Sequence, residues 1–220
     1  GYLYIAETFL GDVRKITCDG EILPESEFVI NTGGFNMGTI GNTLYINPND
    51  NVTFDGRIEA YDLCTGDFIG RVFTVTGDSD WGFYLSDDGT FYTATGIFFN
   101  DNSLTVFNPT DADFANETVF SPSISTGTAE PVVGDVGILP SGDIRGVTTD
   151  PDGNIYIVQQ NEQSTDCTHI YKYSPTYELL AVSTPDCVED GVGYKEAIGI
   201  VYSETCNCLY VSTESQIDDC

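Results

Sequence analysis

Basic side chains are scarce in this sequence. It contains 7 Lys and Arg residues against 35 Asp and Glu residues, which gives a formal net charge of −28 and a pI of about 4.1. A surface of this charge repels nucleic acid and anionic membranes, so we expect neither as a partner. We interpret the acidity as a surface property that favours solubility or adaptation to salty water.

Long apolar runs and catalytic signatures are missing as well. No stretch of about 18 apolar residues could span a bilayer, and no charged-then-apolar leader opens the chain. The sequence has no Gly-x-Ser-x-Gly motif, and its single histidine, His169, begins a predicted strand, where a packing role is more common than catalysis. We therefore predict no membrane insertion and no catalytic residues, although two of the 35 acids could still converge as glycosidase carboxylates.

Helical periodicity is absent, and a unit of short strands recurs in its place. A strand built around a Gly with apolar neighbours comes first, and Met37-Gly38-Thr39 is its weakest copy. A strand centred on an aromatic residue follows about ten residues later. The glycine strands are Met37-Gly38-Thr39, Trp81-Gly82-Phe83, Arg145-Gly146-Val147 and Ile198-Gly199-Ile200. The aromatic strands are Leu3-Tyr4-Ile5, Leu44-Tyr45-Ile46, Phe91-Tyr92-Thr93, Ile155-Tyr156-Ile157 and Leu209-Tyr210-Val211. A repeat of roughly 40–65 residues of this kind is typical of a β-propeller blade.

Two further strands complete each unit. The third strands are predicted at 13–17, 57–61, 104–107 and 169–173, and each is followed by a turn rich in Gly, Asp, Asn, Pro or Ser that can close a hairpin. The outer strands are predicted at 22–23, 68–69, around Phe114 and at 179–180.

The pattern predicts an all-β chain, with residues 1–220 forming one β-propeller domain of four-stranded antiparallel blades. Complete blades are expected at 35–75, 81–120 and 144–183, and incomplete ones at 1–30 and 197–220, so about four and a half blades are visible. Residues 121–143, rich in Pro, Gly and hydroxyl side chains, are expected to form a long surface loop. Such a loop is either a contact site or a tolerated insertion.

The incomplete end blades leave two interpretations open. The chain is either a fragment of a longer propeller, or its open blades are completed by a neighbouring copy in a strand-exchanged polymer.

Two segments carry a family resemblance. They are residues 1–8 followed by 13–16, and residues 146–157, which contain Asp150-Pro151-Asp152-Gly153-Asn154 between a glycine strand and an aromatic strand. Both resemble the NHL-type and SMP-30-like six-bladed propellers. The resemblance implies architecture only, because such propellers serve as binding platforms, scaffolds, lactonases and esterases.

Metal binding is the enzymatic alternative that this resemblance raises. SMP-30-like enzymes hold a metal in the central channel through acidic and amide side chains of the inner strands. The residues beside the inner-strand glycines here are Asn36, Trp81, Arg145 and Ile198, which do not form such a set. The acidic turns at 78–80, 87–89 and 150–154 offer oxygen ligands for Ca²⁺, but hairpins need such turns without any metal. We therefore expect no cofactor and keep calcium as an alternative.

Seven cysteines favour an oxidising, extracellular compartment, since none forms a Cys-x-x-Cys pair. In a four-stranded blade the first and third turns lie on one face of the disc. This places Cys18, Cys64, Cys206 and Cys208 on one face and Cys167, Cys187 and Cys220 on the other. We predict a Cys167–Cys187 disulfide, with Cys18 paired to Cys206 or Cys208 and Cys64 a candidate for the remaining one. Cys220 is predicted to stay unpaired or to bond another chain.

Two sequons also suit a secreted protein. Asn51-Val52-Thr53 and Asn116-Glu117-Thr118 are candidate N-glycosylation sites, although tripeptides of this form also arise by chance.

The functional hypothesis is a non-enzymatic, secreted structural or binding propeller. In its sharper form the chain assembles into a polymer or filament through incomplete terminal blades and intermolecular disulfides. The expected partners are the chain itself or other extracellular proteins and glycans. One alternative is a Ca-dependent lactonase or esterase of the SMP-30-like type, and the other is a ligand-binding fragment of a larger cell-surface receptor.

Overall fold

The computed structural model of the protein describes residues 2–7, 11–25, 27–32, 34–48, 56–75, 80–95, 102–108, 110, 112–126, 131–160, 168–183 and 197–213. Within these residues the chain consists of β-strands and a short 3-10 helix, η2 (Phe114–Asn116), and no α-helix is present. The predicted all-β fold class is confirmed. No helix among these residues has the length and apolar character needed to cross a membrane.

The described strands form five sheets in chain order, antiparallel except for one pairing. The two at the ends have two strands each: β1 (Tyr2–Glu7) and β2 (Asp12–Thr17), and β16 (Ala197–Ser203) and β17 (Cys208–Thr213). The second sheet contains β3 (Gly34–Ile40), β4 (Thr43–Pro48), β5 (Gly56–Asp62) and β6 (Phe68–Val75). The third contains β7 (Asp80–Leu85), β8 (Phe91–Thr95), β9 (Ser103–Phe107), β10 (Ile124–Thr126) and β11 (Ile138–Leu139). The fourth contains β12 (Asp143–Thr149), β13 (Ile155–Gln160), β14 (His169–Tyr173) and β15 (Leu179–Val182).

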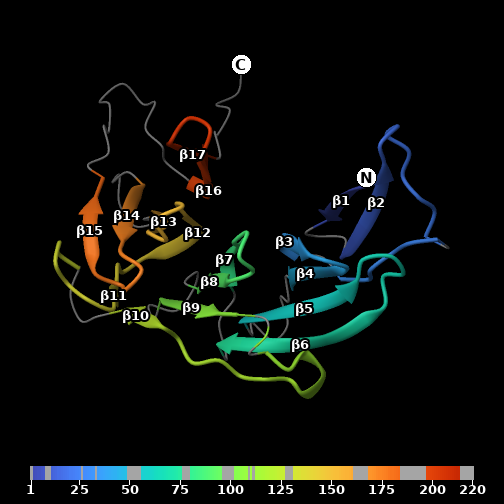
Figure 1. Ribbon diagram of the computed structural model, residues 1–220, viewed down its shortest axis with the longest axis horizontal. Helices are drawn as coiled ribbons and strands as arrows, with labels where there is room; N and C mark the ends of the chain where they lie inside the picture. The colour runs from blue at the N-terminus through green and yellow to red at the C-terminus, as the bar shows by residue number, and fades with distance from the viewer. Residues whose placement is uncertain are drawn as a thin grey trace.

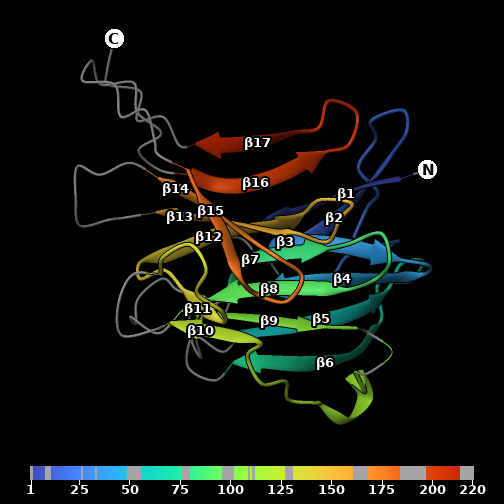
Figure 2. The ribbon, with the colours of Figure 1, turned by 60° about the vertical axis from the view of Figure 1, so that its left-hand side comes forward.

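The sheets are arranged side by side around a common middle (Figures 1 and 2). In the last four sheets the first strand lies nearest that middle, and successive first strands contact one another: β3 contacts β7, β7 contacts β12, and β12 contacts β16. In Figure 1 the two-stranded end sheets, β1–β2 and β16–β17, lie apart at the two ends of the arc.

Close approach of two inner strands explains one of the recurring glycines, Gly146. A Cβ added to Gly146 on β12 would lie 3.0 Å from the backbone nitrogen of Ile200 and 3.1 Å from the Cα of Gly199, both on β16. A Cβ on Gly82 of β7 would lie 3.1 Å from the Cβ of Ala94 on the next strand and 3.4 Å from the carbonyl carbon of Gly146, which is an ordinary van der Waals distance. At Gly146 the two sheets meet backbone against backbone, and a side chain there would hold them apart.

The core lies in layers between successive sheets. Alternation along each strand sends neighbouring side chains to opposite layers: Leu44 and Ile46 on β4 pack toward the first sheet, and Tyr45 packs toward the third. The layer between the third and fourth sheets is the largest of the three described clusters. Its fully buried members include Leu104, Leu139, Ile144, Ile157 and Tyr173.

Four hairpin turns share one hydrogen-bonding pattern. The backbone N–H of the first turn residue donates to the carbonyl four residues later, and the N–H of the fourth residue donates back to the first carbonyl. The first residue also accepts a backbone N–H bond through its side-chain oxygen, and the fourth has a positive φ. These turns span 17–21, 86–90, 150–154 and 174–178, with Gly20, Gly89, Gly153 and Tyr177 at the fourth position.

The outer part of the third sheet differs from the prediction. The expected outer strand around Phe114 is wrong, because this residue lies in η2 and the segment after it pairs with the neighbouring sheet: Phe73 N–H donates to Thr118 at 2.9 Å, and Phe120 N–H donates to Phe73 at 2.9 Å. Gly70 on β6 has no Cβ and so allows the backbone of Phe114 to approach, while the Phe114 ring packs on Tyr45 at 5.4 Å. The sheet is completed instead by β10 and β11, which lie in the segment expected to be a long loop at 121–143.

Candidate functional site

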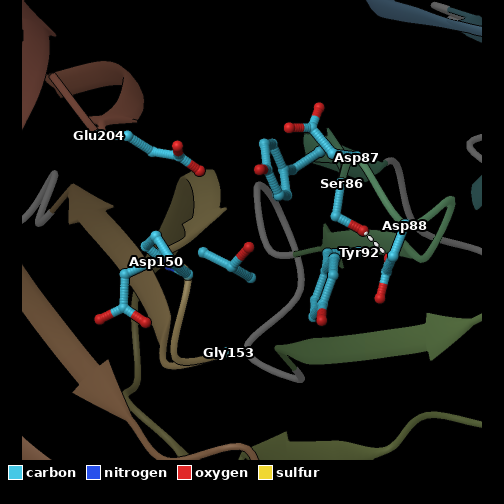
Figure 3. A pocket seen from close by; sticks show the side chains of 10 residues that line it. Ser86, Asp87, Asp88, Tyr92, Asp150, Gly153 and Glu204 are labelled. Atoms are coloured by element: carbon cyan, nitrogen blue, oxygen red, sulfur yellow. Dashed lines mark hydrogen bonds between the residues drawn. The ribbon is translucent and has the colours of Figure 1, made fainter.

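The turns between the first and second strands of the last three sheets lie on one face of the molecule (Figure 2). They enclose an open pocket of about 220 Å³ (Figure 3). The β7–β8 turn, the β12–β13 turn and the β16–β17 turn each contribute to its wall. The lining residues are Tyr84, Ser86, Asp87, Asp88, Tyr92, Thr149, Asp150, Pro151, Gly153 and Glu204.

Four carboxylates line this pocket, and two of them are bonded within their own turns. Asp88 accepts hydrogen bonds from the Ser86 hydroxyl and the Thr90 backbone N–H. The Ser86 hydroxyl bond, followed by the bonds from Thr90, lowers the pKa of Asp88. The aspartate is therefore ionised at neutral pH and engaged in shaping the hairpin.

Asp150 is held by a larger set of donors. Its carboxylate accepts from the backbone N–H of Asn154 at 2.9 Å, from the Asn154 amide at 2.8 Å and from the Tyr156 hydroxyl at 2.9 Å, and it lies 3.6 Å from the Lys172 ammonium. Partial burial raises the pKa of Asp150, but the hydrogen bonds from Asn154 and Tyr156 and the charge of Lys172 outweigh it, and the pKa is lowered. Asp150 fixes its own turn and the strand that follows.

Asp87 and Glu204 are the other two carboxylates of the pocket; both are exposed, and they approach it from opposite sides (Figure 3). With the hydroxyls of Tyr84 and Tyr92, they offer hydrogen-bond acceptors to a ligand that carries ammonium or hydroxyl groups. Among the described residues, no group of three or more His, Cys, Asp or Glu is placed to hold a metal ion.

Sequence reasoning found part of this pocket. The acidic turns at 87–89 and 150–154 are brought together, whereas the third one, at 78–80, lies largely outside the described residues. Glu204 was missed, because its place beside the other two turns follows from the packing of β16 on β12 and has no local sequence signal. His169 lies half-buried on β14, with its Nδ1 at 3.2 Å from the Ser183 carbonyl and its ring near Tyr171.

Four residues lie beside the inner-strand glycines, where SMP-30-like enzymes hold a metal, and the side chains of two of them are described. Asn36 is half-buried on β3, and Arg145 is buried on β12 with its Nη2 3.3 Å from Asp143. The side chains of Trp81 and Ile198 lie outside the described residues.

The cysteine pairing differs from the expected one. Cys206 and Cys208 form a disulfide with each other, and neither is bonded to Cys18 or Cys64, which are exposed. The physical reason is Asn207 between them, whose φ of 53° turns the chain so that the two Cα atoms lie 5.4 Å apart, within the range a disulfide requires. Cys167, Cys187 and Cys220 lie outside the described residues.

The two sequons have different positions relative to the described structure. Asn51 lies outside the described residues. Asn116 is exposed at the end of η2, where its side-chain amide donates to the carboxylate of Asp113, and Thr118 of the same sequon bonds the Asp113 backbone. The Asn116 site stays a prediction.

The end sheets present apolar side chains on their outward faces. Leu3 and Ile5 of β1 are 61% and 43% exposed, and Tyr4 between them packs inward on Phe28. On the other end sheet Val201 and Tyr210 lie directly opposite each other and are 53% and 58% exposed. Among the described strands, β1 pairs only with β2, and β17 pairs only with β16.

Comparison with known proteins gives the fold. No family model and no curated protein matches the chain. Solved structures do match: the Dos1 propeller has a TM-score of 0.55 at 12% identity, over 96% of this chain and 50% of that one. The fold is a β-propeller. Hydrazine synthase from Kuenenia stuttgartiensis aligns with a TM-score of 0.58 at 12% identity, over 97% of this chain and 68% of that one.

A protein of unknown function from Bacteroides caccae also has a TM-score of 0.58, at 11% identity, over 96% of this chain and 65% of that one. The chain thus spans about half to two thirds of the length of these propellers. At such identities the likeness extends to architecture alone. The predicted propeller fold is confirmed, and the narrower resemblance to NHL-type and SMP-30-like propellers stays a prediction.

Proposed function

We propose that this propeller is a non-enzymatic, extracellular structural or binding protein that associates with further copies of itself through its two end sheets. The observation that carries the proposal is the apolar, outward-facing surface on both end sheets, each beside a strand edge that no described strand pairs with.

Inside the propeller, the apolar face of a sheet is normally covered by a neighbouring sheet. In the first four sheets each such face is covered by its neighbour, and its apolar residues are buried in one of the three core layers. Leu3 and Ile5 at one end, and Val201 and Tyr210 at the other, occupy comparable positions without such a cover in the described residues. Exposed apolar surface and open strand edges favour association.

A second copy is the partner that fits both ends. If β17 of one copy pairs with β1 of the next, the result is a four-stranded sheet in the order β16-β17-β1-β2, which has the same number of strands as the second and fourth sheets. Because the two contacting surfaces differ, the contact is head-to-tail and can propagate into rings or filaments.

The net charge opposes this association at low salt. Copies that each carry −28 repel one another, and the repulsion is screened at high ionic strength. We therefore expect monomers at low salt and head-to-tail oligomers as salt and protein concentration rise. Sedimentation across a salt series measures this directly, and a monomer under all conditions would contradict the proposal.

Secretion is supported by the same features that led to it from the sequence, namely seven cysteines and an exposed sequon asparagine at Asn116. Its test is the mass of the protein secreted from eukaryotic cells before and after removal of N-glycans. A mass shift that Asn116→Gln abolishes is expected, and a mass unaffected by glycan removal in both proteins would argue against use of this site.

A further inference from the structure

The hairpin between β16 and β17 contains a disulfide that does little to hold the fold together. Cys206 and Cys208 are separated by one residue, so the bond closes a very short loop and restricts the unfolded chain far less than a long-range disulfide does. The hairpin is also fixed by other bonds. Ser203 pairs with Cys208 in the β16–β17 ladder, and the Tyr202 hydroxyl donates to the Asn207 side chain at 2.6 Å.

The disulfide is also open to solvent. Cys206 is exposed and Cys208 is half-buried, at the tip of a hairpin on the turn face. Exposed disulfides are the ones accessible to an attacking thiolate, and such bonds tend to be labile or regulatory. The Tyr210 hydroxyl lies 3.5 Å from the Cys206 sulfur. Since a disulfide sulfur carries no proton, the hydroxyl is the donor in this contact.

We propose that Cys206–Cys208 is an exchange-active disulfide whose substrate is a thiol. The attacking thiolate forms a bond to the Cys208 sulfur, the Cys206–Cys208 bond breaks, and Cys206 leaves as a thiolate that accepts a hydrogen bond from Tyr210. A second thiol then attacks the mixed disulfide, which releases Cys208 and an oxidised disulfide of the two thiols. Two thiols are thereby oxidised and one protein disulfide is reduced to two thiols, with the two protons passing to the protein thiolates.

The reduced form is prepared for the reverse reaction. The two Cα atoms lie 5.4 Å apart in the disulfide, and the β16–β17 ladder and the Asn207 turn hold this hairpin independently of the sulfurs, so an oxidised partner would meet two adjacent thiols. The proposal does not depend on association through the end sheets, and it is tested at low salt.

The test is the rate of reduction of the folded protein by 2-mercaptoethanol, followed by alkylation and peptide mapping of Cys206 and Cys208. Circular dichroism verifies that the fold persists. We expect the folded protein to be reduced at this bond within about tenfold of the rate in denaturant, as for an unprotected disulfide. A rate at least a hundredfold lower in the folded state would show a protected structural bond and would overturn the proposal.

Two variants and one control variant test the assignment of the sulfurs. Tyr210→Phe should slow reduction several-fold without loss of the fold, whereas Tyr84→Phe, which removes a hydroxyl from the β7 strand, should not change the rate. Equal rates for wild type and Tyr210→Phe would refute Cys206 as the leaving group. In the Cys206→Ser variant, glutathione disulfide should form an adduct on Cys208 that persists, since no neighbouring thiol remains to resolve it. A Cys208 that stays unmodified would count against exchange at this position.

Two sources of thiol share this chemistry, a small-molecule thiol and the exposed Cys64 thiol of a second copy. Non-reducing electrophoresis of the wild type and of Cys64→Ser separates them. A disulfide-linked dimer that the variant lacks identifies the second copy as the source. Exchange with glutathione without a linked dimer identifies the small thiol, and the absence of both would exclude the activity.

Discussion

Individual turn residues determine where the strands of this protein reverse. The fourth position of the shared hairpin pattern has a φ between 66° and 89°, and three of the four turns place glycine there. Gly20 isolates the backbone effect, because a Cβ at this position would meet no atom within 4 Å. We expect Gly20→Ala to lower the free energy of unfolding by about 1 kcal/mol. Urea denaturation measures the change, and Gly20→Asn should cost less because asparagine tolerates this conformation. Equal stabilities of all three proteins would contradict this account of the turn.

Asp150 is expected to make the free energy of unfolding depend on pH. Its carboxylate is bonded in the folded protein and its pKa is lowered, so its stabilising effect is complete above the unfolded value near 4 and is lost as pH falls through the lower folded value. We expect Asp150→Asn to cost about 2 kcal/mol at pH 7. The difference from wild type should shrink below about pH 4. Urea unfolding of both proteins from pH 7 to pH 3 measures it, and a constant difference would be inconsistent with the lowered pKa.

At the residue scale, the sequence predicts which residues form hairpin turns better than it predicts which cysteines pair. Gly89 and Gly153 follow Asp residues in turns that the sequence already marks as hairpins. Tyr177 occupies the same left-handed position without that signal, since its ring packs against the core layer between the third and fourth sheets. The pairing of Cys206 with Cys208 was also missed, because it depends on the φ of Asn207 and not on the face to which the cysteines belong.

At the scale of strands, the inner strands β12 and β16 depend on close contact between their backbones. Gly146 lies between β7 and β16, and a Cβ there would press on the backbone of Ile200 and Gly199. We expect Gly146→Ala to destabilise the protein by about 2 kcal/mol, since the neighbouring strand cannot yield as a flexible side chain would. Thermal unfolding measures the loss, and Thr39→Ala at an exposed position of β3 is the control. A Gly146→Ala variant as stable as that control would contradict backbone contact as the reason for the glycine.

Strands were predictable where local pattern and packing agree. The glycine and aromatic strands at 81–83, 91–93, 145–147 and 155–157 lie within β7, β8, β12 and β13. The outer strand around Phe114 failed because contacts with another sheet override alternation: Gly70 admits the backbone of η2, and the segment after it bonds Phe73. A sequence pattern records neither contact, since both depend on the position of β6 beside the third sheet.

For the whole molecule, the sequence predicts the propeller and its repeat but leaves open what covers the end sheets. The acidic pocket shows the same limit of sequence patterns. Acidic turns that line it can each be predicted from the sequence, but their proximity follows from the order of the sheets around the middle. The apolar faces of β1 and of β16–β17 are likewise visible only once the inward side of each strand is known.

Head-to-tail association makes a prediction that a symmetric contact does not. Leu3→Lys disables the face of β1 and leaves the β16–β17 face intact, and Val201→Lys does the reverse. Each variant alone should stay monomeric, because a cation placed at an apolar contact must lose its hydration. Val133→Lys changes an equally exposed valine away from the end sheets and should associate as the wild type does.

The most direct test of the account is the sedimentation of an equimolar mixture of Leu3→Lys and Val201→Lys at high salt. Each variant retains the surface that its partner needs, so the account predicts a discrete dimer of about twice 23.9 kDa from two proteins that are monomeric alone. Monomers of 23.9 kDa in the mixture, beside a wild type that is also monomeric, would contradict association through the end sheets.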